Sequence, residues 1–147
     1  MKKWTNHKVT QWENDSMKKC DNARPDPPLP HCILTAHFVA DDGAKANFLT
    51  AIRQRLKPGA PLVIVNLCGT SKDPAFAEAV RAWRRHAEVN AMPAEHLDAM
   101  VTNALALPFV SEAREHELLA AAGFTATRRI YQGLCFLGFL SFAGTPA

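Results

Sequence analysis

The fold is decided by three consecutive runs: CILTAHF at residues 32–38, NFLTAIRQRL at 47–56 and PLVIVNL at 61–67. The first and third runs are short, apolar and rich in β-branched residues, which predicts two strands, with the first buried on both faces. The middle run places apolar residues at helical spacing. Strand, helix and strand with short connections form a βαβ unit, so the two strands are expected to be parallel with a right-handed crossover.

Local signals bound the predicted helix of this unit. Asp41-Asp42-Gly43 is typical of a turn that leads into a helix, because carboxylates interact favourably with the first helical turn. Lys57-Pro58-Gly59 is a strong stop signal, since lysine suits the last turn and proline and glycine do not continue a helix.

Three further helices are predicted after the second strand. Asp73-Pro74 is a typical helix start, with aspartate as N-cap and proline in the first turn. A second helix follows Met92-Pro93, and Ser111 is expected to cap a third that stops at Gly123.

Two more strands are predicted at the end of the chain. The runs Thr125–Tyr131 and Leu134–Phe142 are separated only by Gln132-Gly133, which is the spacing of a two-residue β-hairpin. The predicted sheet is therefore mixed, with parallel strands first and an antiparallel pair last.

The first thirty residues have a different character. Four of the six residues at 25–30 are prolines, which lack the amide donor and disfavour helix at the preceding position. We predict an irregular leader with a Pro-rich linker at residues 1–30 and an α/β domain at residues 31–147.

Composition excludes several classes of protein. With 147 residues, 48% of them hydrophobic and 21% charged, the chain is neither a disordered tail, nor collagen-like, nor a coiled coil. A net charge of +3 is too small to indicate nucleic-acid binding by itself. The four cysteines form no C-x-x-C pair, so no disulfide framework or metal site is expected. No apolar segment follows Met1-Lys2-Lys3, and the run at 134–142 is about half of a membrane span. These features predict a soluble cytoplasmic protein.

Three motifs resemble class I S-adenosylmethionine-dependent methyltransferases, in that family's order: LTAHFVADD at 34–42, LTAIRQRLKPGA at 49–60 and LLAAAGF at 118–124. They resemble the family's fourth strand, the signature before its fifth strand and the signature before its sixth. The resemblance covers about residues 31–142 and implies the C-terminal half of a Rossmann-like domain. That half has parallel strands, a C-terminal antiparallel hairpin and helices on both faces.

One departure from the family concerns the cofactor. The family binds S-adenosylmethionine mainly through a glycine-rich turn after its first strand, where glycines let the backbone approach the ligand. No G-x-G occurs in this sequence, and no apolar strand precedes Cys32. The expectation is a truncated chain in which methyl transfer is weak or absent.

Candidate site residues lie beyond the carboxyl ends of the parallel strands, where open α/β sheets bind ligands. The resemblance implies S-adenosylmethionine as cofactor and a small molecule as methyl acceptor. His37 is the candidate catalytic residue, as a base or as a contact to the acceptor. The candidate cofactor contacts are Phe38, Val39 and Asp41, and the candidate substrate contacts are Asn66, Cys68 and Trp83.

Each candidate also has a purely structural interpretation. His37 could pack or cap at the strand end, and Asp41 could serve only the helix start. Cys68 could be a small buried hydrophobe, and Trp83 could belong to the core.

Three functions therefore stay open. The first is methyl transfer to a small molecule. The second is a non-catalytic remnant, or an interaction module that pairs with itself or with another chain through an exposed sheet edge. The third, ranked last, is nucleic-acid binding through the N-terminal lysines and the arginines at 81–85.

Overall fold

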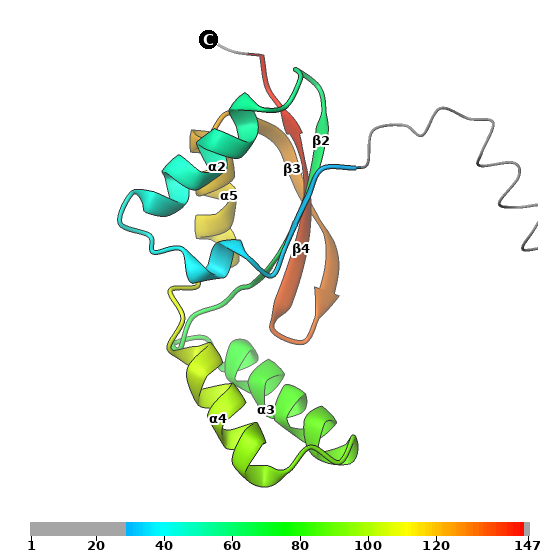
Figure 1. Ribbon diagram of the computed structural model, residues 1–147. Coiled ribbons are helices and arrows are strands. Elements are labelled where there is room, and N and C mark those ends of the chain that lie inside the picture. The colour runs from blue at the N-terminus through cyan, green and yellow to red at the C-terminus, as the bar shows by residue number, and fades with distance from the viewer. Residues whose placement is uncertain (1–28, 146–147) are drawn as a thin grey trace, which may run out of the picture.

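A computed structural model describes residues 29–145, which form a sheet with helices on one side and a helical hairpin beyond its end (Figure 1). The predicted leader at residues 1–30 lies almost entirely outside the described residues. The elements are β1 (His31–Ile33), a 3₁₀ helix η1 (Ala36–Phe38), α2 (Ala44–Gln54), β2 (Pro61–Leu67), α3 (Pro74–Val89), α4 (Ala94–Leu105), α5 (Glu112–Ala121), β3 (Phe124–Gly133) and β4 (Phe136–Ala143).

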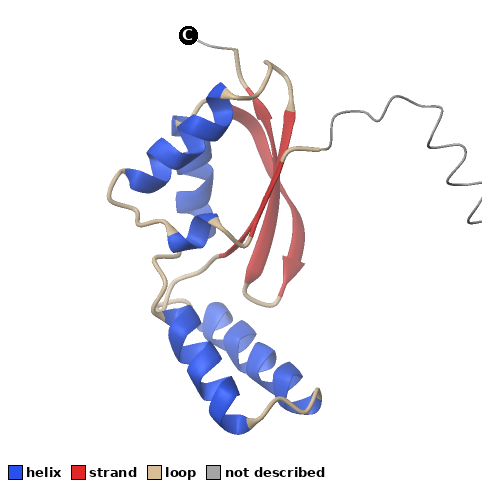
Figure 2. Cartoon of the chain, in the orientation of Figure 1, coloured by secondary structure: helices blue, strands red, loops and turns tan. Residues whose placement is uncertain are grey.

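The four strands form one mixed sheet in the order β1-β2-β4-β3 (Figure 2). β1 pairs with β2 in parallel, whereas β4 is antiparallel to both β2 and β3. The predicted βαβ unit and the predicted C-terminal antiparallel pair are thus confirmed. None of the described helices combines the length and the apolar character needed to cross a membrane.

The first strand is much shorter than predicted. Only His31–Ile33 pairs with β2, and Leu34 takes a left-handed backbone conformation with φ of 52°. This conformation turns the chain out of the sheet and into η1, so residues 36–38 are helical rather than extended. The prediction that this strand is buried on both faces is also wrong. Only Cys32 is buried, because it points to the face that packs against α2 and α5, whereas His31 and Ile33 point to the face that no described helix covers.

The hairpin turn lies two residues later than predicted. Gly133 still pairs with Phe136, and Leu134 and Cys135 make the turn. Leu134 supplies the left-handed conformation, with φ of 56°. Gly133 has a different role: a side chain there would overlap the hydroxyl end of Tyr131.

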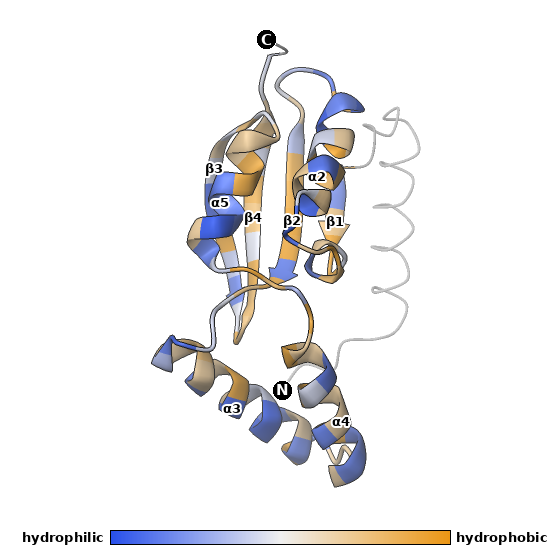
Figure 3. Ribbon diagram, turned by 90° about the vertical axis from the view of Figure 1, so that its left-hand side faces the viewer, coloured by the Kyte–Doolittle hydropathy of each residue, from blue (hydrophilic) through white to orange (hydrophobic). Residues whose placement is uncertain are grey.

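The main core lies between the sheet and two helices. α2 contributes Leu49 and α5 contributes Leu119, which pack with Ile64 of β2 and Phe139 of β4, all four fully shielded from solvent. The strands β2 and β4 carry much of the apolar colouring in Figure 3. The helices α2 and α5 lie on the same side of the sheet (Figure 1). Within the described residues, helices therefore cover one face of the sheet, rather than both faces as the resemblance implied.

The helices α3 and α4 form a hairpin past the carboxyl end of β2 (Figures 1 and 3). They share a small core of Ala87, Leu97 and Val101. The hairpin meets the sheet through Trp83, whose ring stands edge-on to Phe136 of β4 with centroids 5.3 Å apart. This contact positions the hairpin beside the end of the sheet where a ligand is expected.

The predicted helix caps are confirmed. Asp73 Oδ1 accepts a hydrogen bond of 2.9 Å from the Ala75 amide, and Ser111 Oγ accepts one of 3.2 Å from the Arg114 amide. Each side chain satisfies one of the amides that a helix start leaves without a partner.

Candidate functional site

An apolar pocket of about 370 Å³ lies between the end of the sheet and the helical hairpin. Three predicted site residues meet there: His37 and Phe38 from η1, and Trp83 from α3. The rest of the lining consists of Leu34, Leu67, Met100, Asn103, Ala104, Leu107 and Phe136. Among the described residues, no side chain with a formal charge lines this pocket, and its polar groups come from His37, Asn103 and the indole N–H of Trp83.

His37 is held by the backbone of β2. The Leu67 amide donates a hydrogen bond of 3.3 Å to His37 Nδ1, and the ring is buried. Burial lowers the pKa of His37, the charge of Lys45 lowers it further, and the Asn66 amide acts in the opposite direction. The imidazole is therefore neutral over a wider pH range than a free histidine.

A buried polar cluster lies next to His37, beneath α2 and α5. Asn66 Nδ2 donates a hydrogen bond of 2.8 Å to Glu115 Oε1, and both side chains are almost completely buried. The other oxygens of the pair, Asn66 Oδ1 and Glu115 Oε2, have no hydrogen-bond partner within residues 29–145. Burial raises the pKa of the Glu115 carboxyl, against the opposing effects of the Asn66 amide and the Lys45 charge.

Lys45 is the third member of this cluster. Its Nζ donates a hydrogen bond of 3.0 Å to the Pro108 carbonyl, and its side chain is almost fully buried. Burial lowers the pKa of Lys45, while Glu115 and Asp41 oppose that change. Together these bonds link η1 to β2, β2 to α5, and α2 to the loop before α5.

Sequence reasoning missed Lys45, Glu115 and Asn103. A signal for two of them existed in the helical spacing. Lys45 shares the buried side of α2 with Leu49, four residues later. Glu115 shares the buried side of α5 with Leu118 and Leu119. Asn103 carried no such signal, because it joins the pocket only through the folding of the hairpin.

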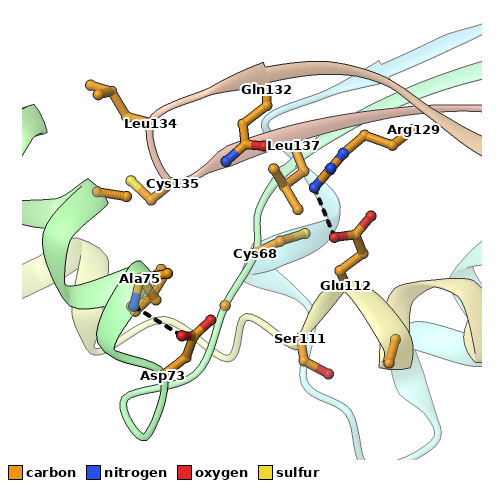
Figure 4. A pocket seen from close by; sticks show the side chains of 14 residues that line it. Cys68, Asp73, Ala75, Ser111, Glu112, Arg129, Gln132, Leu134, Cys135 and Leu137 are labelled. Atoms are coloured by element: carbon orange, nitrogen blue, oxygen red, sulfur yellow. Dashed lines mark hydrogen bonds and ion pairs between the residues drawn. The ribbon is translucent and has the colours of Figure 1, made fainter.

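A second pocket of about 580 Å³ lies on the other side of the β2 terminus, between α3, α5 and the β3–β4 turn (Figure 4). Four of its polar side chains are already engaged. Arg129 donates a 3.0 Å hydrogen bond to Glu112, and Asp73 and Ser111 cap helices. Cys68 lines this pocket, and burial raises its pKa to about 12, so the thiol stays protonated. The predicted substrate contact Cys68 is thus separated from His37 and Trp83.

Two more predicted residues point to other partners. Both carboxylate oxygens of Asp41 accept hydrogen bonds from the Arg114 guanidinium, at 2.9 and 3.1 Å. These bonds are the main reason that the pKa of Asp41 is lowered. The amide of Asn66 is turned to Glu115 in the core rather than to the pocket. Val39, half-buried after η1, lines neither pocket.

The arginines of α3 are paired with carboxylates. Arg81 lies 3.8 Å from Glu78, Arg85 lies 3.2 Å from Glu88, and Arg84 contacts Asp98. All of these side chains are largely exposed, as on an ordinary solvated helix.

Comparison with known proteins shows similarity only at the level of structure: no family model and no curated protein matches this sequence. Human N-acetylserotonin methyltransferase, solved in complex with SAM, is 19% identical over 82% of this chain and 32% of its own, with a TM-score of 0.50. A possible exported protein from Bordetella parapertussis is 16% identical over 83% of this chain and 42% of its own, with a TM-score of 0.55. An O-methyltransferase family 2 protein from Planctomyces limnophilus, in complex with apigenin, is 15% identical over 82% and 32%, with a TM-score of 0.48.

The likenesses to the human and the Bordetella proteins establish the fold. The described residues form an α/β arrangement of the methyltransferase type, as the resemblance of the three sequence motifs implied. The chain spans about a third of the length of the human methyltransferase that it matches.

The residues present do not fit a complete site for S-adenosylmethionine. Asp41, the one carboxylate among the candidate cofactor contacts, is bound on both oxygens by Arg114. The sequence also holds no G-x-G turn that would let a backbone approach the nucleoside part of the cofactor. What the described residues do provide is the pocket beside His37.

Proposed function

We propose that the described residues form the acceptor-binding part of an S-adenosylmethionine-dependent methyltransferase that acts on a small molecule. One observation carries this proposal: a neutral, buried histidine lines an apolar pocket at the carboxyl end of β2, in a methyltransferase-type fold. Largely apolar pockets with a few placed polar groups are the usual form of small-molecule sites.

The side chains of the pocket have separate roles in this proposal. S-adenosylmethionine, when bound, supplies an electrophilic methyl group. Phe38 and Trp83 hold the acceptor between the sheet and the helical hairpin, and they exclude water from it. His37 contacts the polar group of the acceptor and fixes its orientation.

Because Asp41 is engaged and no glycine-rich turn is present, we expect this chain alone to bind the methyl donor only weakly. The three described cysteines are free, buried thiols, which suits a reducing compartment, so we place the protein in the cytoplasm.

The direct test is transfer of a radiolabelled methyl group from S-adenosylmethionine to a panel of small aromatic alcohols, amines and thiols. We expect weak transfer to at least one acceptor, reduced about tenfold or more in His37→Ala. His86→Ala is the matched control, because His86 lies exposed on α3 away from the pocket. Equal loss in both variants, or no transfer to any acceptor, would count against the proposal.

A second candidate function is pairing with another chain, as an interaction module. The observation that favours it is the face of the sheet that the described helices leave uncovered, where Ile33, Val65 and Tyr131 share one row across the strands. Such a face and the single-sided pairing of β1 suit a partner that completes the sheet.

A further inference from the structure

The two ring nitrogens of His37 have different surroundings. Nδ1 accepts a hydrogen bond from the Leu67 amide, and a backbone amide can only donate. A neutral imidazole carries one protonated and one unprotonated nitrogen, so an accepting Nδ1 places the proton on Nε2. His37 therefore presents an N–H at the ring nitrogen that the backbone of β2 does not use.

The walls of the pocket restrict what can meet this N–H. Its aromatic side chains, Phe38, Trp83 and Phe136, come from three different elements, and most of the remaining lining is aliphatic. Among the described residues, no lysine, arginine, aspartate or glutamate lines the pocket, so none of them compensates for the desolvation of a charged ligand. The volume of about 370 Å³ lies near the lower end of the range for ligand pockets. The fitting ligand is small, flat and uncharged.

We propose that His37 recognises the acceptor by donating a hydrogen bond from Nε2, so that the pocket selects an uncharged aromatic molecule with a hydrogen-bond-accepting oxygen. This inference rests on the proposed use of the pocket as the acceptor site. It gives His37 a positioning role in place of the role of a base, because Nδ1 is occupied by the Leu67 amide and Nε2 already carries a proton.

The test compares ligands of one shape with different polar groups, by ligand-observed NMR titration of the full chain. 2-Methoxynaphthalene offers an accepting oxygen only, 2-ethylnaphthalene offers none, 2-naphthol both donates and accepts, and 2-naphthoate is charged. We expect the methoxy compound to bind about three- to tenfold more tightly than the ethyl compound, the range for one neutral hydrogen bond. 2-Naphthol should bind about as tightly as the methoxy compound, and 2-naphthoate at least about tenfold more weakly.

Variants assign this preference to His37. In His37→Phe the methoxy and ethyl compounds should bind equally, whereas His37→Gln, which keeps an N–H donor, should retain part of the preference. Ala104→Trp fills this pocket and should abolish binding. Ala113→Trp makes the same change in the second pocket and should leave binding unchanged.

The outcomes separate this inference from the proposed function, because binding is read without methyl transfer. If 2-naphthol binds about threefold or more tightly than the methoxy compound, His37 accepts a proton and the inference is wrong. It is equally wrong if none of the uncharged compounds binds, or if Ala113→Trp rather than Ala104→Trp blocks them. An intact oxygen preference with no methyl transfer to any acceptor would overturn the proposed function and leave the inference standing.

Discussion

At the scale of single residues, the unpartnered oxygens of Asn66 and Glu115 have one common explanation. The amide of Asn66 already donates to Glu115 Oε1, so the two planar groups face each other, and both leftover oxygens are acceptors. One proton on Glu115 Oε2 would let that oxygen donate to Asn66 Oδ1 and give both a partner. The raised pKa of Glu115 agrees with a carboxyl that favours its protonated form in the folded protein.

This explanation predicts a pH dependence of stability. Because the folded pKa of Glu115 lies above its unfolded value, the folded state holds the proton more tightly. The stabilisation is complete below the unfolded pKa and is lost as the pH rises through the folded pKa. Glu115→Gln carries an N–H in place of the acid proton and does not titrate. The free energy of unfolding of the wild type, measured by urea denaturation from pH 4 to 8, should therefore fall relative to that of Glu115→Gln. A difference in free energy of unfolding between the two proteins that stays constant from pH 4 to 8 would contradict the proposed proton on Glu115.

Gly69 gives a second prediction at this scale. A side chain at Gly69 would overlap the ring of Phe76, which is buried at the start of α3. We expect Gly69→Ala to destabilise the fold by about 1–3 kcal/mol, the usual cost of overpacking, measured by thermal unfolding.

The control for this substitution is Gly43→Ala. Gly43 has φ of 102° and open space around it, so only backbone strain of about 1 kcal/mol is expected there. Phe76→Leu should recover part of the loss in Gly69→Ala and none in Gly43→Ala. Equal effects in both backgrounds would show that the Phe76 ring is not the cause.

At the scale of elements, the sequence predicted what depends on neighbours in the chain. Asp73 and Ser111 cap α3 and α5 through amides two and three residues away, so their signals are local and the helix starts were predicted correctly. The position at which β1 ends depends on a contact that is distant in sequence. Leu34 turns out of the sheet while its amide donates a hydrogen bond to the Val65 carbonyl of β2. No residue pattern at 32–38 contains that information.

The same limit applies to the candidate site. His37, Phe38 and Trp83 line one apolar pocket. The sequence placed His37 and Phe38 near a ligand because strand ends in an α/β sheet have a general role, and that a ligand binds there stays a prediction. The burial of Lys45 depends on the Pro108 carbonyl, 63 residues away in sequence, and the separation of Cys68 from the pocket depends on how the hairpin folds back. Long-range contacts of this kind cannot be predicted from the periodicity or the composition of the sequence.

The β3–β4 turn supports a prediction for this element. Leu134 is a branched residue with φ of 56°, in the left-handed region that costs most side chains about 1–2 kcal/mol. Leu134→Asn should stabilise the fold by about 0.5–1 kcal/mol, because asparagine tolerates this conformation and Leu134 is partly exposed. Leu134→Ala loses the same apolar contacts and keeps the strain, so it should not stabilise. A lower unfolding midpoint for Leu134→Asn than for Leu134→Ala would refute this account of the turn.

At the scale of the whole molecule, the two faces of the sheet are unequal. One face packs against α2 and α5 around Ile64 and Phe139. The other carries a row formed by Ile33, Val65 and Tyr131, with Gly138 between the last two, and no described helix packs against it. Ile33 is 45% exposed and Tyr131 is 53% exposed.

Within the part of the chain that the structure describes, this apolar row is uncovered and β1 pairs on one side only, an arrangement that favours self-association. We expect the chain to form dimers or larger species whose proportion rises with protein concentration, as measured by sedimentation velocity. Ile33→Lys places a charge in the row at the edge strand, where it should shift the species towards monomer, because burying an unpaired charge in an interface is costly. Val89→Lys is the matched control, since Val89 is an exposed apolar residue at the end of α3, away from the sheet. A wild-type chain that stays monomeric at the highest concentrations, or an equal shift in both variants, would show that this face of the sheet does not drive association.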